Sequence, residues 1–256
     1  MAGKDRKTAF VTGGGSGIGS GIVKVLAKAG YDVAFSYCGS KNGAEETVLE
    51  AKEYGGRIFS VRSDVSKIGE ITAMFNAVTN AFGKLDLFVN NAGITEKSDF
   101  LSTTPELFDK ICAVDDRGAF FCMQRAAKIM VESGTKGNII LISSNNTVAH
   151  FADVSVYASA KSAAAKMAEH AAIELAKYGI RVNTIAPGWT DTGASRLDAK
   201  EETYYKVPLK KWATIEEIGQ AIVFLASDAA SSVTGTTMVI DNGASLVSDK
   251  RERSGF

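Results

Sequence analysis

A tyrosine and a lysine stand four positions apart within the stretch "YASAK" at residues 157–161. Side chains at positions i and i+4 of a helix lie on the same face, so Tyr157 and Lys161 are predicted to face the same space. A tyrosine phenol has a pKa of about 10 in water, and a nearby positive charge favours its phenolate form. The pair can therefore act as a proton-transfer catalyst, although the same spacing also occurs on ordinary helix faces.

A second candidate site is the glycine-rich stretch "TGGGSGIG" at residues 12–19, which lies between an apolar run and a predicted helix. Glycines permit a tight turn and let a phosphate approach the backbone closely. The N–H groups and the dipole at the start of a helix attract the same phosphate. In a chain that alternates strands and helices, this position favours a dinucleotide site over a plain strand–helix connection.

The elements that must position these residues alternate along the whole chain. Short apolar runs predict strands at 8–13, 31–37, 57–61, 85–90, 138–143, 180–186 and 236–241. Amphipathic or alanine-rich segments predict helices at about 17–29, 42–54, 67–82, 105–133, 155–178 and 214–227. Strands that are apolar on both faces are typical of a parallel sheet covered by helices on both sides. We therefore expect an α/β fold, a doubly wound, seven-stranded parallel sheet in a single domain over residues 1–256.

Composition excludes several classes of function. The formal net charge is zero, which removes the basic excess that binds nucleic acid. The three cysteines, Cys38, Cys112 and Cys122, show neither metal-type spacing nor an even count, and they predict reduced thiols in a cytoplasmic protein. We expect no signal peptide, no membrane association and no metal site, because no apolar run is long enough and no ligand set is apparent.

Further motifs follow the later predicted strands in order. "NNAG" at 90–93 follows the fourth strand, "ISS" at 142–144 the fifth and "APG" at 186–188 the sixth. With the glycine turn and the tyrosine–lysine pair, these motifs resemble those of the short-chain dehydrogenase/reductase family, which are single-domain Rossmann oxidoreductases. The resemblance extends over about residues 7–245. It implies hydride transfer between a nicotinamide cofactor and a ketone or secondary alcohol.

The resemblance also implies a role for individual residues. Tyr157 would be the acid/base, Lys161 would lower its pKa and bind the nicotinamide ribose, and Ser144 would hold the substrate oxygen. Ser143 is the alternative, but the interval of thirteen residues to the tyrosine favours Ser144. Asp64 resembles the residue that meets the adenine, although it could instead cap the following helix, a role that Ser66 could also fill. The implied cofactor-binding residues are Gly13, Gly15, Ser16, Gly17, Ile18, Gly19, Tyr37, Ser40, Lys41, Asp64, Val65, Asn91, Ala92, Gly93, Tyr157, Lys161, Pro187, Gly188, Thr190 and Thr192.

One position departs from the family pattern. The stretch "VDDRGAF" at 114–120 places Asp115 where the family carries an asparagine that completes a catalytic tetrad. That asparagine works largely through its backbone carbonyl, which holds a water next to the lysine, and an aspartate presents the same carbonyl. An ionised aspartate, however, cannot donate a hydrogen bond. Asp115 is therefore either a tolerated near-isostere or a cause of altered pH dependence or reduced turnover.

The choice of nucleotide is predicted from the second strand, which ends "FSYCGSK". NAD sites often place an acid at this end to bind the ribose hydroxyls, but Tyr37 occupies the position and the next carboxylate is Glu45. Ser40 and Lys41 could donate hydrogen bonds to a 2′-phosphate. Cys38 stands where many NADP-using relatives carry arginine. We therefore expect NADP(H) to be favoured, with NAD(H) possible.

The resemblance places a substrate lid at about 189–212 and a second substrate-facing loop at 145–155. The lid aromatics could line an apolar or sugar-stacking pocket or could cap the lid from outside; they are Trp189, Tyr204 and Tyr205. The candidate polar contacts in the loop are Asn145, Asn146 and His150. These residues do not distinguish 3-oxoacyl thioesters, sugars or polyols, and steroids.

The family resemblance also implies a homotetramer or homodimer. The alanine-rich helix at 155–178 favours close packing, either on its own sheet or against a second subunit. The tail at 246–256 could reach a neighbouring active site. Two other readings stay open: a catalytically impaired nucleotide-binding scaffold, and a lyase or epimerase that does not consume its nucleotide.

Overall fold

The strands of the protein form one parallel sheet. The computed structural model describes residues 6–193 and 206–247. Within those residues, seven strands lie in the spatial order β3-β2-β1-β4-β5-β6-β9, and every neighbouring pair is parallel. Their bounds are β1 (Thr8–Val11), β2 (Asp32–Tyr37), β3 (Ile58–Arg62), β4 (Leu87–Asn90), β5 (Asn138–Ile142), β6 (Arg181–Pro187) and β9 (Thr237–Ile240). The predicted seven-stranded parallel sheet is confirmed.

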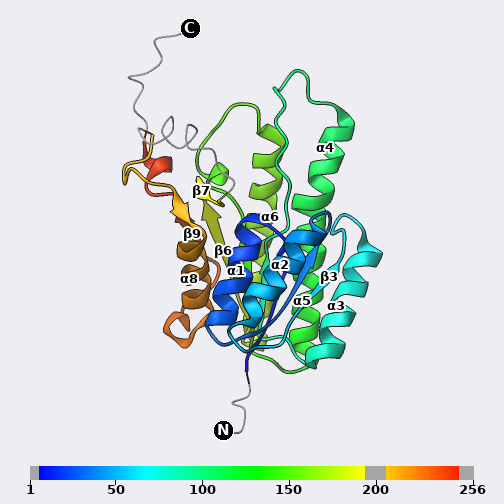
Figure 1. The fold of residues 1–256 in the computed structure, drawn as a ribbon. Helices are drawn as coiled ribbons and strands as arrows, with labels where there is room; N and C mark the ends of the chain where they lie inside the picture. The colour runs from blue at the N-terminus through cyan, green and yellow to red at the C-terminus, as the bar shows by residue number, and fades with distance from the viewer. Residues whose placement is uncertain (1–5, 194–205, 248–256) are drawn as a thin grey trace.

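Helices cover both faces of this sheet (Figure 1). Their bounds are α1 (Gly17–Lys28), α2 (Lys41–Lys52), α3 (Ile68–Phe82), α4 (Pro105–Cys112), α5 (Ala119–Glu132), α6 (Ser155–Leu175) and α8 (Ile215–Ala226). Helices α1, α2 and α8 pack their apolar side chains on one face of the sheet. Helices α3, α5 and α6 pack theirs on the other face. This two-sided cover confirms the doubly wound fold.

The order of the strands creates the place where a ligand can bind. From β1 the chain proceeds outward through β2 and β3, and it then returns to β4, beside β1, and continues in the opposite direction. The two crossovers on either side of this switch point diverge, which leaves a crevice at the carboxyl ends of β1 and β4. The glycine turn and the "NNAG" motif follow these two strands, so both lie at the crevice.

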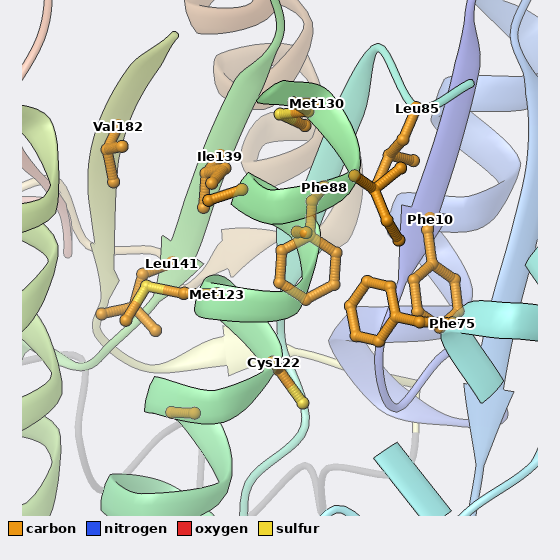
Figure 2. Close-up of a cluster of buried hydrophobic side chains, with 14 of the residues drawn as sticks. Phe10, Phe75, Leu85, Phe88, Cys122, Met123, Met130, Ile139, Leu141 and Val182 are labelled. Atoms are coloured by element: carbon orange, nitrogen blue, oxygen red, sulfur yellow. The ribbon is translucent and has the colours of Figure 1, made fainter. Parts of the chain in front are cut away.

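Three phenylalanine rings form the centre of the core under α3 and α5. Figure 2 shows Phe10 of β1, Phe75 of α3 and Phe88 of β4 turned toward one another. The centroids of the Phe10 and Phe75 rings are 4.9 Å apart in an edge-to-face arrangement, and those of Phe75 and Phe88 are 5.3 Å apart. All three side chains are fully buried. Such aromatic pairs add to the stabilisation that burial alone provides.

The structure differs from the sequence prediction in the helix expected over 105–133. That segment is interrupted by a π-helical stretch, η1 (Ala113–Gly118), between α4 and α5. A Cβ added at Gly118 would lie 2.6 Å from the carbonyl oxygen of Val65, so the backbone of the π-helix packs directly on the loop after β3. Hydrophobic periodicity does not record an extra residue in a helical turn, and the interruption was therefore missed.

Shorter elements complete the described chain. A two-stranded parallel pair, β7 (Thr190–Asp191) and β8 (Ala213–Thr214), was not predicted. The 3-10 turns are η2 (Asn145–Thr147), η3 (Ala176–Tyr178), η4 (Asp228–Ala230) and η5 (Ala244–Leu246). Residues 194–205 of the expected lid and 248–256 of the expected tail lie outside the described residues. In the portion that is described, none of the helices has the length and apolar character needed to cross a bilayer.

Replacement of Phe75 by alanine tests the aromatic cluster. Phe75→Ala should lower the free energy of unfolding by about 3–5 kcal/mol, because it removes a buried ring and leaves a cavity between two others. Urea unfolding followed by circular dichroism measures this change. Leu49→Ala, at a position of α2 that is 71% exposed, is the control and should change the free energy by no more than about 0.5 kcal/mol. Equal losses in the two variants would contradict the assignment of the core.

Candidate functional site

A cavity of about 590 Å³ opens at the switch point of the sheet. It lies over the carboxyl ends of β1, β2 and β4, where the crevice is expected. The residues predicted to bind a cofactor that line it are Gly13, Gly15, Ser16, Ile18, Gly19, Tyr37, Ser40, Asp64, Val65, Asn91, Ala92 and Gly93. The structure therefore brings together residues from four separate connections of the sheet in one cavity.

The glycine turn lets the backbone form the floor of this cavity. Gly17 has a φ of +54°, a conformation that side chains with a Cβ rarely adopt. A Cβ at Gly19 would lie 2.1 Å from the carbonyl oxygen of Gly13, so the turn closes only with glycine at that position. Ser16 makes no side-chain cap, and the first turn of α1 carries no acid. The free N–H groups at the start of α1 therefore fit the pyrophosphate of a dinucleotide.

Asn91 connects the end of β4 to this turn. Its Nδ2 donates to the backbone carbonyl of Thr12 at 2.9 Å. In return, Oγ1 of Thr12 accepts from the backbone N–H groups of Asn91 and Ala92, both at 3.0 Å. These bonds hold the glycine turn and the "NNAG" loop against each other. Asn91 is thus a structural support of the cavity wall.

Asp64 lies in the cavity wall and binds its own loop. Its Oδ1 accepts from the backbone N–H and the hydroxyl of Ser66, at 3.0 and 2.7 Å. Partial burial would raise the pKa of Asp64, but the two bonds from Ser66 and the charge of Lys67 together lower it. The N-cap position of α3 is Lys67, so neither Asp64 nor Ser66 caps that helix.

Arg62 is a cation near the nucleotide-binding loop that the sequence analysis missed. It ends β3 and pairs in register with Tyr37, the last residue of β2. Its Nε donates to the carbonyl of Cys38 at 3.5 Å, and its side chain is exposed. Lys41, which was predicted, is paired with Glu45 at 3.8 Å. Arg62 could have been found from the sequence, because the carboxyl ends of neighbouring parallel strands lie side by side.

Tyr157 and Lys161 lie on the same face of α6, as their spacing predicts. Nζ of Lys161 lies 5.8 Å from the centroid of the Tyr157 ring. The lysine is only 5% exposed, and its Nζ donates to the carbonyl of Ile142 at 3.3 Å. The tyrosine is half-buried. An ammonium group is thus held beside the phenol in a largely dry environment, where charges interact more strongly than in water.

Asp115 contacts this lysine directly. The residue lies in the π-helix η1 and is fully buried. Its Oδ2 accepts from the backbone N–H of Ile94 at 3.0 Å, and its Oδ1 lies 2.9 Å from Nζ of Lys161. No donor among the described residues is directed at Oδ1 in hydrogen-bonding geometry, so the contact is an ion pair rather than an aligned hydrogen bond. A Cβ at Gly93 would lie 2.4 Å from Oδ1 and 2.8 Å from Nζ, and the pair therefore needs glycine there.

The two serines after β5 have different partners. The hydroxyl of Ser143 donates to the backbone carbonyl of Lys161 at 3.1 Å and so ties the end of β5 to α6. Oγ of Ser144 accepts from Nδ2 of Asn146 at 2.9 Å and from its backbone N–H at 3.2 Å. The hydroxyl proton of Ser144 is not used in either bond. Ser144 is therefore the serine with a donor to offer a substrate, which agrees with the spacing argument.

The remaining predicted cofactor residues lie after β6. Thr192 is next to the glycine turn, because a Cβ on Gly17 would lie 3.9 Å from its methyl group. Thr190 donates from Oγ1 to the carbonyl of Gly188 at 3.1 Å, and Pro187 ends β6. Thr192 therefore lies beside the start of α1, whereas residues 187–192 are not among those that line the cavity.

The predicted substrate residues lie in different environments. Asn145 is buried, and its Nδ2 donates to Asp241 at 3.4 Å. The ring of Trp189 lies 5.6 Å from that of Phe151, centroid to centroid, and His150 is exposed. Asn145 is therefore engaged within the protein, whereas Trp189 is half-buried and His150 lies at the surface. Tyr204 and Tyr205, also expected in the lid, lie outside the described residues.

The described cysteines and acids do not form a reactive thiol site or a metal site. Cys122 is buried beneath the sheet, and burial raises the pKa of its thiol to about 12. Burial, followed by the charges of the neighbouring aspartates, also raises the pKa of Cys112. Over residues 6–193 and 206–247, no three His, Cys, Asp or Glu side chains converge to hold a metal ion.

Removal of the lysine tests the buried ion pair. Lys161→Met should lower the free energy of unfolding by about 3–5 kcal/mol, because it leaves the carboxylate of Asp115 buried without a counter-charge. Addition of Asp115→Asn in the same chain should restore part of the loss. Lys166→Met, which removes an exposed lysine of the same helix, is the control. Denaturant unfolding of the four proteins checks the prediction, and a double variant no more stable than Lys161→Met would contradict it.

Comparisons with known proteins identify the family. The family model described as enoyl-(acyl carrier protein) reductase matches residues 13–245. The 3-oxoacyl-[acyl-carrier-protein] reductase of Staphylococcus aureus strain Mu50 is 36% identical over 243 residues, which are 94% of this chain and 98% of the relative.

Two solved structures are similar in both sequence and fold. Acetoin dehydrogenase YohF from Salmonella typhimurium is 31% identical, with a TM-score of 0.89 over 96% of this chain and 98% of that one. Levodione reductase is 31% identical, with a TM-score of 0.88 over 95% and 99% of the two chains. The chain therefore belongs to the short-chain dehydrogenase/reductase family, whose members are nicotinamide-dependent oxidoreductases of alcohols and ketones.

Proposed function

We propose that this protein transfers a hydride between NADP(H) and a ketone or secondary alcohol, with Tyr157 as the acid/base. The observation that supports this most is the position of Lys161, which lies beside the phenol on one side and beside Gly93 of the nucleotide cavity on the other. A phenol that lies beside a buried ammonium can exchange a proton with a carbonyl oxygen.

The residues have separate tasks in this reaction. The nicotinamide, when bound, supplies the hydride. The N–H groups at the start of α1 hold the pyrophosphate, and Lys161 binds the nicotinamide ribose. Ser144 directs its free hydroxyl proton at the substrate oxygen, while Tyr157 donates a proton to that oxygen in reduction or accepts one in oxidation. The charge of Lys161 stabilises the phenolate left after reduction.

The substrate is proposed from the relatives and is a small carbonyl compound or an acyl thioester. The relatives' names refer to a 3-oxoacyl carrier-protein thioester, to acetoin and to levodione. A screen of this chain should therefore start with acetoacetyl thioesters and small ketones or diketones, and then include keto sugars and oxosteroids. Trp189 and Phe151 offer an apolar edge at this end of the site.

We also propose a homotetramer or homodimer in the cytoplasm. The alanine-rich α6 carries Ile173, which is 76% exposed, and the neighbouring α5 carries Phe120, which is 38% exposed. Exposed apolar side chains on adjacent helices are suited to contacts with a second copy of the chain.

Replacement of Tyr157 by phenylalanine tests the acid/base assignment. Tyr157→Phe should lower kcat with the best carbonyl substrate by about 100-fold or more, because only the proton donor is removed. Initial rates of NADPH oxidation measure the change, and fluorescence titration of NADPH binding shows that the cavity is intact. Tyr178→Phe, at an exposed tyrosine of η3, is the control and should keep its rate. A Tyr157→Phe protein with an unchanged rate would sink the assignment.

The preference for NADP(H) is proposed from the groups around the end of β2. No carboxylate stands there to repel a 2′-phosphate, and Ser40 lines the cavity as a donor. Arg62 adds an exposed guanidinium beside the Cys38 carbonyl and makes no ion pair with any described residue. It can supply the positive charge that Cys38 does not. A guanidinium binds phosphate with two parallel hydrogen bonds, which favours NADP(H) over NAD(H).

Arg62→Ala tests this preference. The variant should lose about 10- to 100-fold in kcat/KM for NADPH, the equivalent of one charge-assisted hydrogen bond or two, while kcat/KM for NADH stays nearly constant. Steady-state rates with both nucleotides give the ratio. Lys52→Ala, which removes an exposed cation at the opposite end of α2, is the matched control. Equal loss with both nucleotides, or no loss with either, would show that Arg62 does not bind the 2′-phosphate.

A further inference from the structure

The carboxylate of Asp115 is a charge in the active site that the proposed reaction does not use. It is fully buried, and one of its oxygens lies 2.9 Å from the ammonium of Lys161. The other oxygen is held by the backbone N–H of Ile94, so the carboxylate cannot turn away without breaking that bond. An asparagine, the residue that the family pattern leads one to expect, would present a neutral amide at the same place.

The exchange of a neutral group for an anion changes the electrostatics of the site. The pair of Asp115 and Lys161 is about neutral as a whole, whereas the lysine alone is a cation. The influence of Lys161 on the phenol of Tyr157 depends on that positive charge, and a negative charge at 2.9 Å offsets much of it. Because both groups are more than nine-tenths buried, water does little to screen the carboxylate.

The other titratable groups around the pair are few. Tyr157 of α6 lies beside the pair. The thiol of Cys112, at the end of α4, also lies near it, and burial, followed by the charges of neighbouring aspartates, raises the pKa of that thiol. Asp116 is the next residue in η1, and burial raises the pKa of its carboxyl. The described residues of the loop after β4 and of β5 contribute only backbone groups to the pair.

We propose that Asp115 is a positioning residue that offsets the charge of Lys161 beside the phenol of Tyr157, and that it thereby changes the pH dependence of proton transfer by this tyrosine. This inference takes the acid/base role of Tyr157 from the proposed function. In reduction, a bound NADPH would supply the hydride by loss of its nicotinamide C4–H bond. The new C–H bond would form as the carbonyl π bond breaks, and Tyr157 would give its phenol proton to the carbonyl oxygen. The phenolate then regains a proton from solvent. Oxidation begins with the phenolate instead, and Asp115 restricts it to more alkaline solution.

Direct titration of Tyr157 tests the inference without any need for turnover. The near-ultraviolet absorbance of phenolate is recorded against pH with NADP⁺ bound, and the signal of the corresponding Tyr157→Phe protein is subtracted to isolate this one tyrosine. The subtraction is made in the native chain and in the Asp115→Asn chain. Loss of the carboxylate should move the titration midpoint of Tyr157 to lower pH in this difference measurement, as expected for a cation that is no longer offset. The pH profile of alcohol oxidation should shift in the same direction.

Asp116→Asn is the matched control, because it removes the same charge one residue away and should leave the midpoint in place. Asp115→Ser is a second neutral variant for the case that Asp115→Asn does not fold. A midpoint that is unchanged or higher without the Asp115 carboxylate, or one that moves equally in Asp116→Asn, overturns the inference. The two proposals fail separately: a shifted midpoint in a protein without turnover refutes only the proposed reaction, and turnover with an unshifted midpoint refutes only the role of Asp115.

Discussion

The buried ion pair between Asp115 and Lys161 is the constraint on which the rest of the site depends. Transfer of two charges from water to the protein interior is costly, and their attraction compensates only when the geometry is fixed and the remaining polar atoms have partners. Here the backbone of Ile94 holds the carboxylate, and the carbonyl of Ile142 holds the ammonium. The π-helix η1, the loop after β4 and α6 must therefore lie in one arrangement for the pair to exist.

The same loop after β4 joins the ion pair to the nucleotide cavity. Asn91, at its start, holds the glycine turn through Thr12, and Gly93, two residues later, gives the ion pair its space. A shift of this loop would change both the floor of the cavity and the contact between the two charges. The glycine turn and the buried ion pair are thus joined by contacts of four consecutive residues, 91–94.

The sequence predicted those features that depend on regular periodicity and on motif order. The seven strands were found within a few residues because each is a short apolar run. The five central strands are buried on both faces, and the edge strands β3 and β9 are only partly buried. The glycine turn and Tyr157–Lys161 were found from spacing. The π-helix at 113–118 was not, since one extra residue in a turn leaves no mark on a hydrophobic pattern. Arg62 was missed because the predicted third strand ends at residue 61 and the end of that strand was not compared with the end of β2, which lies beside it.

The ion pair itself was beyond sequence analysis for a more specific reason. The identity of Asp115 was visible, and a loss of hydrogen-bond donation was expected from it, but the direction of its side chain depends on the π-helical turn. In that turn the carboxylate points at the N–H of Ile94 and at Nζ of Lys161 rather than at solvent. Aspartate at this position, where the family pattern has asparagine, has a carboxylate oxygen in place of the amide nitrogen. That difference changes the net charge beside the phenol. The charge beside the phenol therefore depends on the backbone geometry that aims the carboxylate as well as on the tyrosine and lysine themselves.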